Sequence, residues 1–183
     1  MSESEILPES DLERLIVAHP EWLEGVDQGD PRPGHPEGKA LYHVHEVLAN
    51  IEKYYRESPL RPQLRVIALL HDTFKHRVDR KKSLSGENHH AMLARRFAER
   101  LSVRDAAVLD LLEHHDEAWN CWQKGNRDGK WEKGLTRLQA LIARLGPNLP
   151  LYVAFYRCDN ETGDKTQDCY AWFLKQLPPD LPR

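Results

Sequence analysis

Histidine is the residue type in this sequence most able to do chemistry. The chain has 183 residues, and ten of them are histidine. Most of the ten occur in close groups, which are His43 with His45, His71 with His76, His89 with His90, and His114 with His115. Histidine is the commonest metal ligand in proteins, and its charge changes most readily near neutral pH. The groups therefore predict a site for metal binding or for acid–base chemistry.

Two aspartates lie where the sequence predicts little water. Asp72 and His71 follow the strongly apolar segment 64–70, and Asp159 ends another apolar segment. His43 lies beside an apolar stripe and can point inward. Burying an ionised carboxylate is costly unless the group is paired or bound to a cation. Each residue alone is explained as a helix cap or a core histidine, but two imidazoles and two carboxylates together suit Zn, Mn, Fe, Co or Ni.

The elements that must position these side chains are predicted to be helices, and the predicted fold class is all-α. Apolar residues recur at helical spacing through most of the chain, and no strand pattern is found. A short helix is expected from the capping box at 10–13 to the residue before Pro20. Residues 25–38 and the tryptophan-rich segment 117–131 are expected to be irregular. Longer helices are expected at about 40–57, 62–72, 88–101, 105–115, 135–145, 149–159 and 164–177.

Composition limits the class of protein. The length favours one domain. Apolar residues make up 40% of the chain and the net charge is −3, so composition gives no general drive towards nucleic acid or anionic lipid. Three scattered cysteines fit neither a disulfide framework nor a cysteine-based zinc site. No secretory signal or bilayer-spanning apolar run is visible, so we expect a cytoplasmic protein without a membrane partner.

Three segments resemble the HD superfamily of metal-dependent phosphohydrolases. Residues 69–75 read Leu-Leu-His-Asp-Thr-Phe-Lys, which resembles the family motif apolar-apolar-His-Asp-x-x-Lys. Residues 35–43 read His-Pro-Glu-Gly-Lys-Ala-Leu-Tyr-His, which is similar to a segment of the HD domains fused to tRNA nucleotidyltransferases. Residues 156–159 read Tyr-Arg-Cys-Asp and match the helix end that carries the family's last ligand. The resemblance spans about residues 35–160.

The resemblance implies a helical bundle of the HD type at residues 35–183. A short helix and a Gly/Pro-rich arm at residues 1–34 would precede it. The implied ligands of one divalent ion (Mn, Fe, Zn, Co, Ni or Mg) are His43, His71, Asp72 and Asp159. Water on such an ion becomes a nucleophile near neutral pH. Asp72 would accept its proton or orient it, and Lys75 would meet a phosphate as a point charge.

Other histidines are candidates for binding substrate or a second metal ion. Many relatives carry a histidine at the position of Gly86, and His89 or His90 could replace it. His114 and His115 resemble the paired histidines of dinuclear relatives. His115 continues an apolar stripe, so it is the better placed of the two to point inward. We expect one metal ion; the alternatives are a second ion on His115 or a purely structural role for that buried histidine.

Three polar or aromatic features outside the motifs are open to two interpretations. Lys165, in the polar turn 160–165, could contact substrate, or the turn could simply join two helices with Asp164 as a cap. The basic segment 75–82 could steer an anionic substrate or form a solvated face. The tryptophans of 117–131 could stack on a base or anchor a loop on the core.

These observations favour an enzyme that hydrolyses a phosphomonoester or a phosphodiester. Its partner would be a small phosphorylated substrate, a nucleotide or a related metabolite, while nucleic acid is not favoured. One alternative is a non-catalytic module that binds a metal and a nucleotide as a sensor. Another is a structural helical protein whose histidines and aspartates meet by coincidence. A homo-oligomer is compatible with the sequence.

Overall fold

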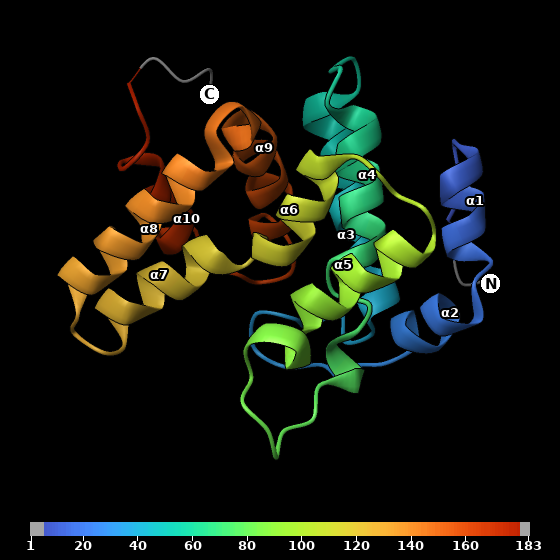
Figure 1. Ribbon diagram of the computed structural model, residues 1–183, viewed down its shortest axis with the longest axis horizontal. Coiled ribbons are helices and arrows are strands. Elements are labelled where there is room, and N and C mark those ends of the chain that lie inside the picture. The colour runs from blue at the N-terminus through green and yellow to red at the C-terminus, as the bar shows by residue number, and fades with distance from the viewer. Residues whose placement is uncertain (1–5, 180–183) are drawn as a thin grey trace.

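The computed structural model describes residues 6–179, and within them it contains ten α-helices and no β-strand beyond an isolated bridge between Arg32 and His35 (Figure 1). The predicted all-α class is therefore confirmed. The helices are α1 (Asp11–Val17), α2 (Pro20–Val26), α3 (Ala40–Tyr55), α4 (Arg61–Leu70), α5 (His90–Arg100), α6 (Ala106–His114), α7 (Glu117–Asn126), α8 (Trp131–Leu145), α9 (Leu149–Asn160) and α10 (Asp168–Leu174). Single 3₁₀ turns lie at Lys75–Arg77, Gly86–Asn88 and Gly146–Asn148.

Helix α4 is the central element because almost all of its surface is apolar. Leu64, Ile67 and Leu69 are completely buried. The helix packs against α1, α3, α6 and α9, and Figure 1 shows it in the middle of the bundle with α1 and α2 to one side and α7, α8 and α10 to the other. Its C-terminal end therefore delivers His71 and Asp72 into the interior.

The N-terminal segment is more ordered than the sequence suggested. Helix α2 was not expected, since Pro20 was interpreted only as the end of α1. Proline also fits the first turn of a helix, and Nδ1 of His19 accepts a hydrogen bond from the backbone N–H of Glu21 to cap it. Buried Trp22 donates from Nε1 to the carbonyl of Leu69 at 2.7 Å. Residues before the matched motifs thus brace the end of α4.

The expectation of a loop at 117–131 was wrong. Most of this segment is α7, which forms an antiparallel hairpin with α8 (Figure 1). The buried face of α7 consists of the small residues Ala118, Cys121 and Gly125. A Cβ at Gly125 would lie 1.9 Å from the ring of Trp131, so the hairpin requires glycine there. Small residues carry little hydrophobic signal, which is why the helix was missed.

The last helix begins later than expected, because Asp164 does not cap it. Helix α10 starts at Asp168. Oδ1 of Asp164 instead accepts a hydrogen bond at 2.6 Å from the backbone N–H of Gly34, which ties the turn after α9 to the N-terminal arm.

The three cysteines are buried, and none of them forms a disulfide. Among residues 6–179, no helix has the length and apolar character needed to cross a membrane.

Candidate metal centre

Three mutually packed helices carry the four side chains that the sequence singled out. Helices α3, α4 and α9 contact one another in every pairing. His43 lies in the first turn of α3, His71 and Asp72 directly follow α4, and Asp159 lies in the last turn of α9. The first three are buried, and the side chain of Asp159 is 19% exposed. Residues 116 positions apart in the sequence are thereby brought to one place.

The four side chains converge within a few ångströms. Nε2 of His43 lies 3.1 Å from Nε2 of His71 and 3.0 Å from Oδ1 of Asp159. Oδ2 of Asp72 lies 3.7 Å from the Nε2 atoms of both His43 and His71. We call these four residues the first donor set. Nε2 of His43, Nε2 of His71 and a carboxylate oxygen of Asp159 lie close enough together to hold one cation, and Asp72 stands beside them.

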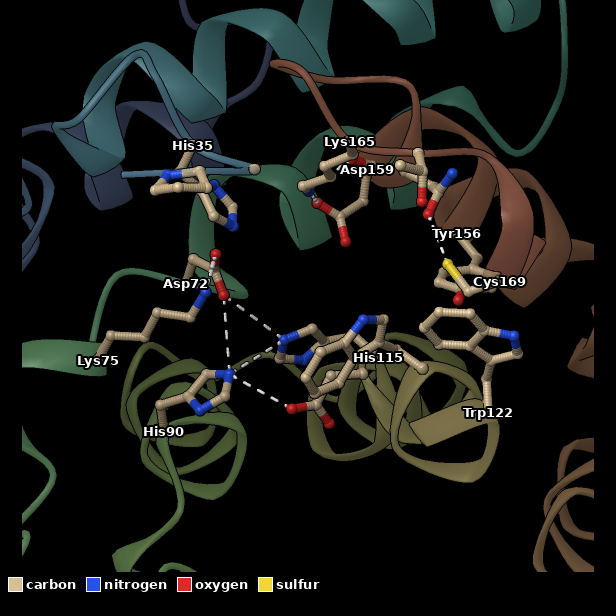
Figure 2. Close-up of a pocket in the computed structure, with 16 residues that line it drawn as sticks. His35, Asp72, Lys75, His90, His115, Trp122, Tyr156, Asp159, Lys165 and Cys169 are labelled. Atoms are coloured by element: carbon tan, nitrogen blue, oxygen red, sulfur yellow. Dashed lines mark hydrogen bonds and ion pairs between the residues drawn. The ribbon is translucent and has the colours of Figure 1, made fainter. Parts of the chain in front are cut away.

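A second donor set uses the other oxygen of the same aspartate. Oδ1 of Asp72 lies 3.6 Å from Nε2 of His90 and 3.6 Å from Nε2 of His115. The two Nε2 atoms are 3.2 Å apart. His90 opens α5, and His115 follows α6. Figure 2 shows both rings pointing at Asp72, so this carboxylate stands between two histidine pairs.

Hydrogen bonds on the far side of the rings indicate which nitrogen is free to bind a cation. Nδ1 of His71 lies 3.1 Å from the carbonyl of Ala68, and Nδ1 of His115 lies 3.0 Å from the carbonyl of Leu112. A carbonyl only accepts, so each Nδ1 carries the hydrogen and each neutral ring presents a bare Nε2. A bare nitrogen and a carboxylate oxygen are both acceptors, so a cation between them satisfies both. Such backbone bonds are typical of metal-ligating histidines, and the donor sets fit a divalent metal.

Burial and nearby charge shift the pKa of these groups in different directions. Burial would lower the pKa of His43 and His115, but Asp159 and Glu37 raise it at His43, and Asp72 and Asp116 raise it at His115. Burial lowers the pKa of His71 to about 3 and that of His90 to about 2, so both rings are neutral at pH 7. For Asp72, burial alone would raise the pKa, but the Lys75 ammonium and nearby imidazoles hold it well below its usual value. Lys165 and His43 outweigh burial in the same way at Asp159. Both carboxylates are therefore ionised.

Two lysines stand next to the donor sets. Nζ of Lys75 lies 2.5 Å from Oδ2 of Asp72. Nζ of Lys165 lies 3.0 Å from Oδ1 of Asp159 and 2.8 Å from its backbone carbonyl. Each ammonium group therefore pairs with a carboxylate of the first donor set and also borders open space.

That open space is a cavity of about 470 Å³. Its polar side is formed by Asp72, Asp159, His90 and His115 together with both lysines. Trp119, Trp122, Tyr156 and Cys169 also line it, and Figure 2 shows Trp122, Tyr156 and Cys169 gathered away from Lys75. The cavity thus combines a charged end with an aromatic end.

Comparison with known proteins agrees with this geometry. The family model of the HD domain matches residues 40–145, more than half of the chain. The chain belongs to the HD family. HD domains are generally metal-dependent phosphohydrolases. Comparison with curated proteins and with solved structures gives no match. Asp159 lies beyond the residues matched as an HD domain, so its place in the first donor set rests on the geometry of α9.

Not every candidate histidine of the HD domain reaches the cavity. Nδ1 of His114 lies 2.9 Å from the carbonyl of Asp110, and the side chain does not line the cavity. Nδ1 of His89 caps α5 by accepting from the N–H of Ala91, which leaves Nε2 facing Asp116 at 3.6 Å. His114 and His89 therefore stand outside the two donor sets.

The sequence interpretation missed two neighbours of the first donor set. His35 and Glu37 belong to the His-Pro-Glu-Gly segment, which had been used only to locate His43. The structure places Glu37 against His43, with His35 behind it. The signal was present in the motif, since a buried carboxylate beside a candidate metal histidine is a common arrangement.

Proposed function

We propose that this protein hydrolyses phosphate esters with the help of a divalent metal ion. One relationship carries the proposal: Asp72 presents its two oxygens to two histidine pairs while Lys75 contacts the same carboxylate. A divalent ion held there would lower the pKa of a coordinated water towards neutrality and polarise a phosphoryl oxygen. Phosphoester hydrolysis needs both effects together with positive charge for the phosphate.

Each side chain of the site has a role in this proposal. His43, His71, Asp72 and Asp159 hold the ion. Asp72 also orients the attacking water or accepts its proton, as an ionised carboxylate next to the reaction can do. Lys75 and Lys165 bind the phosphate oxygens with charge-assisted hydrogen bonds. Burial of His43, His71 and Asp72 keeps bulk water from weakening their interactions with the ion.

The second donor set favours a second ion. Three ligand atoms, from Asp72, His90 and His115, lie together, and the ring of His115 is fixed by the carbonyl of Leu112. One carboxylate can bridge two ions in two-metal hydrolases, where the pair stabilises both the attacking and the leaving oxygen. The sequence favoured one ion, and the geometry supports adding a second at this position.

The aromatic end of the cavity supports a nucleotide-like substrate. Trp119 is 44% exposed, and both it and Trp122 line the cavity. Trp122 lies away from Lys75 (Figure 2). Exposed indole faces stack on nucleobases, whereas an aliphatic leaving group gains less from them. We therefore propose a nucleoside phosphate or a related aromatic phosphoester as the substrate.

The test is elemental analysis of the purified protein, followed by a hydrolysis screen with the metal found that detects both released phosphate and nucleoside monophosphate formed from a diester. Substrates should include nucleoside monophosphates, cyclic nucleotides and sugar phosphates. We expect bound metal and hydrolysis that is lost about 10²–10⁴-fold in Asp72→Asn, because that variant removes the shared ligand and the proton acceptor. His114→Asn is the matched control, since His114 lies outside both donor sets.

Two results would overturn the proposal in different ways. Metal together with saturable nucleotide binding, but no product from any substrate, would indicate a sensing module. A protein without metal, whose stability is unchanged by a chelator, would indicate a structural helical protein.

A further inference from the structure

Two buried polar atoms beside the first donor set lack a hydrogen-bond partner. They are Oε2 of Glu37 and Nδ1 of His43. The side chain of Glu37 is only 5% exposed, and that of His43 is 3% exposed. A carboxylate oxygen and a ring nitrogen left unpaired in the interior are costly, so their placement calls for an interaction that offsets the cost.

The two residues face each other. Oε1 of Glu37 lies 3.5 Å from Nδ1 of His43, and the same oxygen lies 2.9 Å from Nδ1 of His35. The Nε2 atom on the other side of the His43 ring lies 3.0 Å from Asp159. The row His35, Glu37, His43 therefore ends in the first donor set.

His43 differs from the other fixed rings in the group that its far nitrogen faces. His71 and His115 each have Nδ1 near a backbone carbonyl three residues earlier. Glu37 is the acceptor that Nδ1 of His43 faces instead. A carboxylate behind a metal-bound imidazole fixes its tautomer and orientation and makes the ring a better ligand. We propose that Glu37 is the positioning residue of His43, and that His35 holds Glu37; the inference rests on the proposed metal site.

The surrounding backbone leaves the carboxylate little freedom to move elsewhere. A Cβ at Gly163 would lie 3.1 Å from Oε2 of Glu37, so the turn after Asp159 packs directly on it. Next along the chain, Gly38 has φ +76 and a Cβ there would lie 2.9 Å from the ring of Pro31, which fixes the path of the arm beside Glu37. Both glycines permit close approach that a larger residue would block. The carboxylate is therefore held between α3 and the turn that follows the ligand Asp159.

A purely structural role for Glu37 predicts something different. In that case its contacts would only fasten the arm to α3, and their loss would lower stability while the folded protein bound metal as before. A positioning role predicts weaker metal binding by the folded protein. Metal affinity, measured apart from catalysis, separates the two roles.

The experiment compares Co²⁺ affinity, by competition with a chromophoric chelator, in wild type, Glu37→Ala, Glu37→Gln and Glu46→Gln. Glu46 is the matched control because its carboxylate contacts the same turn, accepting from the N–H of Gly163 at 2.8 Å, without facing His43. Circular dichroism confirms folding, and the Co²⁺ absorption spectrum reports ligand geometry. We expect about 10–100-fold weaker binding and an altered spectrum in Glu37→Ala, a smaller loss in Glu37→Gln, and wild-type values in Glu46→Gln.

The outcomes separate this inference from the proposed function. Wild-type Co²⁺ affinity and spectrum in folded Glu37→Ala, even with a lower melting temperature, would overturn the positioning role and leave the metal site intact. If Glu37→Ala does not fold, Glu37→Gln decides in the same way, because it keeps the shape and removes the charge. Failure of wild type itself to bind Co²⁺ or any other divalent ion would overturn the metal site and this inference with it.

Discussion

The Nε2 atoms of His90 and His115 lie 3.2 Å apart, with their rings nearly perpendicular at 73°. Asp72 faces both through Oδ1, while its Oδ2 faces the pair His43 and His71. The two histidine pairs therefore face different oxygens of one carboxylate. This relationship sets the expected number of ions and the effect of removing single ligands.

Removal of the His90 side chain should abolish binding of the ion at the second donor set and leave the ion at the first donor set in place. We expect His90→Asn to retain about half of the metal held by wild type after dialysis, because the first donor set is untouched. Asp72→Asn should lose most of the metal, since it serves both sets. Metal content per chain, measured by mass spectrometry of the digested protein, checks this. A wild-type content of one ion that is unchanged in His90→Asn would contradict a second site.

Substitution of Lys75 or Lys165 should weaken the interaction of the protein with the phosphate group of the substrate. Lys75→Met and Lys165→Met are each expected to lower kcat/KM by about 10–100-fold, the equivalent of a hydrogen bond to a charged group worth about 1.5–3 kcal/mol. Lys81→Met is the matched control, because Lys81 lies in the exposed part of the basic segment. Steady-state kinetics with the best substrate tests the prediction. Wild-type kcat/KM in Lys75→Met and Lys165→Met would show that neither lysine acts in the mechanism.

A buried ion pair far from the cavity should govern stability without affecting activity. Arg65 donates to the carboxylate of Glu13 at 3.0 and 2.8 Å, and both side chains are buried. Glu13→Ala removes the buried carboxylate and leaves the Arg65 guanidinium with Glu9 and the carbonyl of Leu7 as partners, so we expect the free energy of unfolding to fall by about 1.5–3 kcal/mol. Asp11→Ala removes an exposed pair with Arg14 and should cost less than about 1 kcal/mol. Urea denaturation measures both, and similar losses in the two variants would contradict the assignment.

Two of the three cysteines, Cys121 and Cys158, should be unreactive in the folded protein. Burial raises the pKa of Cys121 to about 12 and that of Cys158 to about 12, so almost no thiolate forms at pH 8. We expect Ellman's reagent to label neither thiol within minutes under native conditions and to label all three cysteines at once in guanidinium. Rapid native labelling of Cys121 or Cys158 would show that their surroundings open to solvent.

The sequence predicted the helices that carry the candidate ligands well because their apolar patterns are strong. The segment before His71 is apolar on almost every side, so a central helix ending there was the expected result. Packing between helices determined the elements that periodicity did not predict. Pro20 ends one helix and opens the next, and periodicity alone does not show the second role. Helix α7 was missed because small residues such as Ala118 form its buried face.

The limits of prediction at the site have a similar cause. His115 continues an apolar stripe at helical spacing, so the sequence predicted that it points inward more than His114 does. In the structure His115 is buried and His114 is partly exposed. The apolar pattern of the sequence did not reveal that Asp72 would face four imidazoles. Helices α5 and α6 bring His90 and His115 to Asp72 only when the bundle folds. The pairing of Glu37 with His43 depends on a turn of the N-terminal arm, and the path of such a turn is set by packing against the segment after Asp159.

The position of a bound ion tests the central claim most directly. Crystals of the Mn²⁺-loaded protein, measured above and below the manganese absorption edge, would locate the ion by its anomalous signal. We predict a peak within about 2.0–2.3 Å of Nε2 of His43, Nε2 of His71 and carboxylate oxygens of Asp72 and Asp159. A fully loaded protein whose manganese lies elsewhere, with these four side chains pointing apart, would contradict the account.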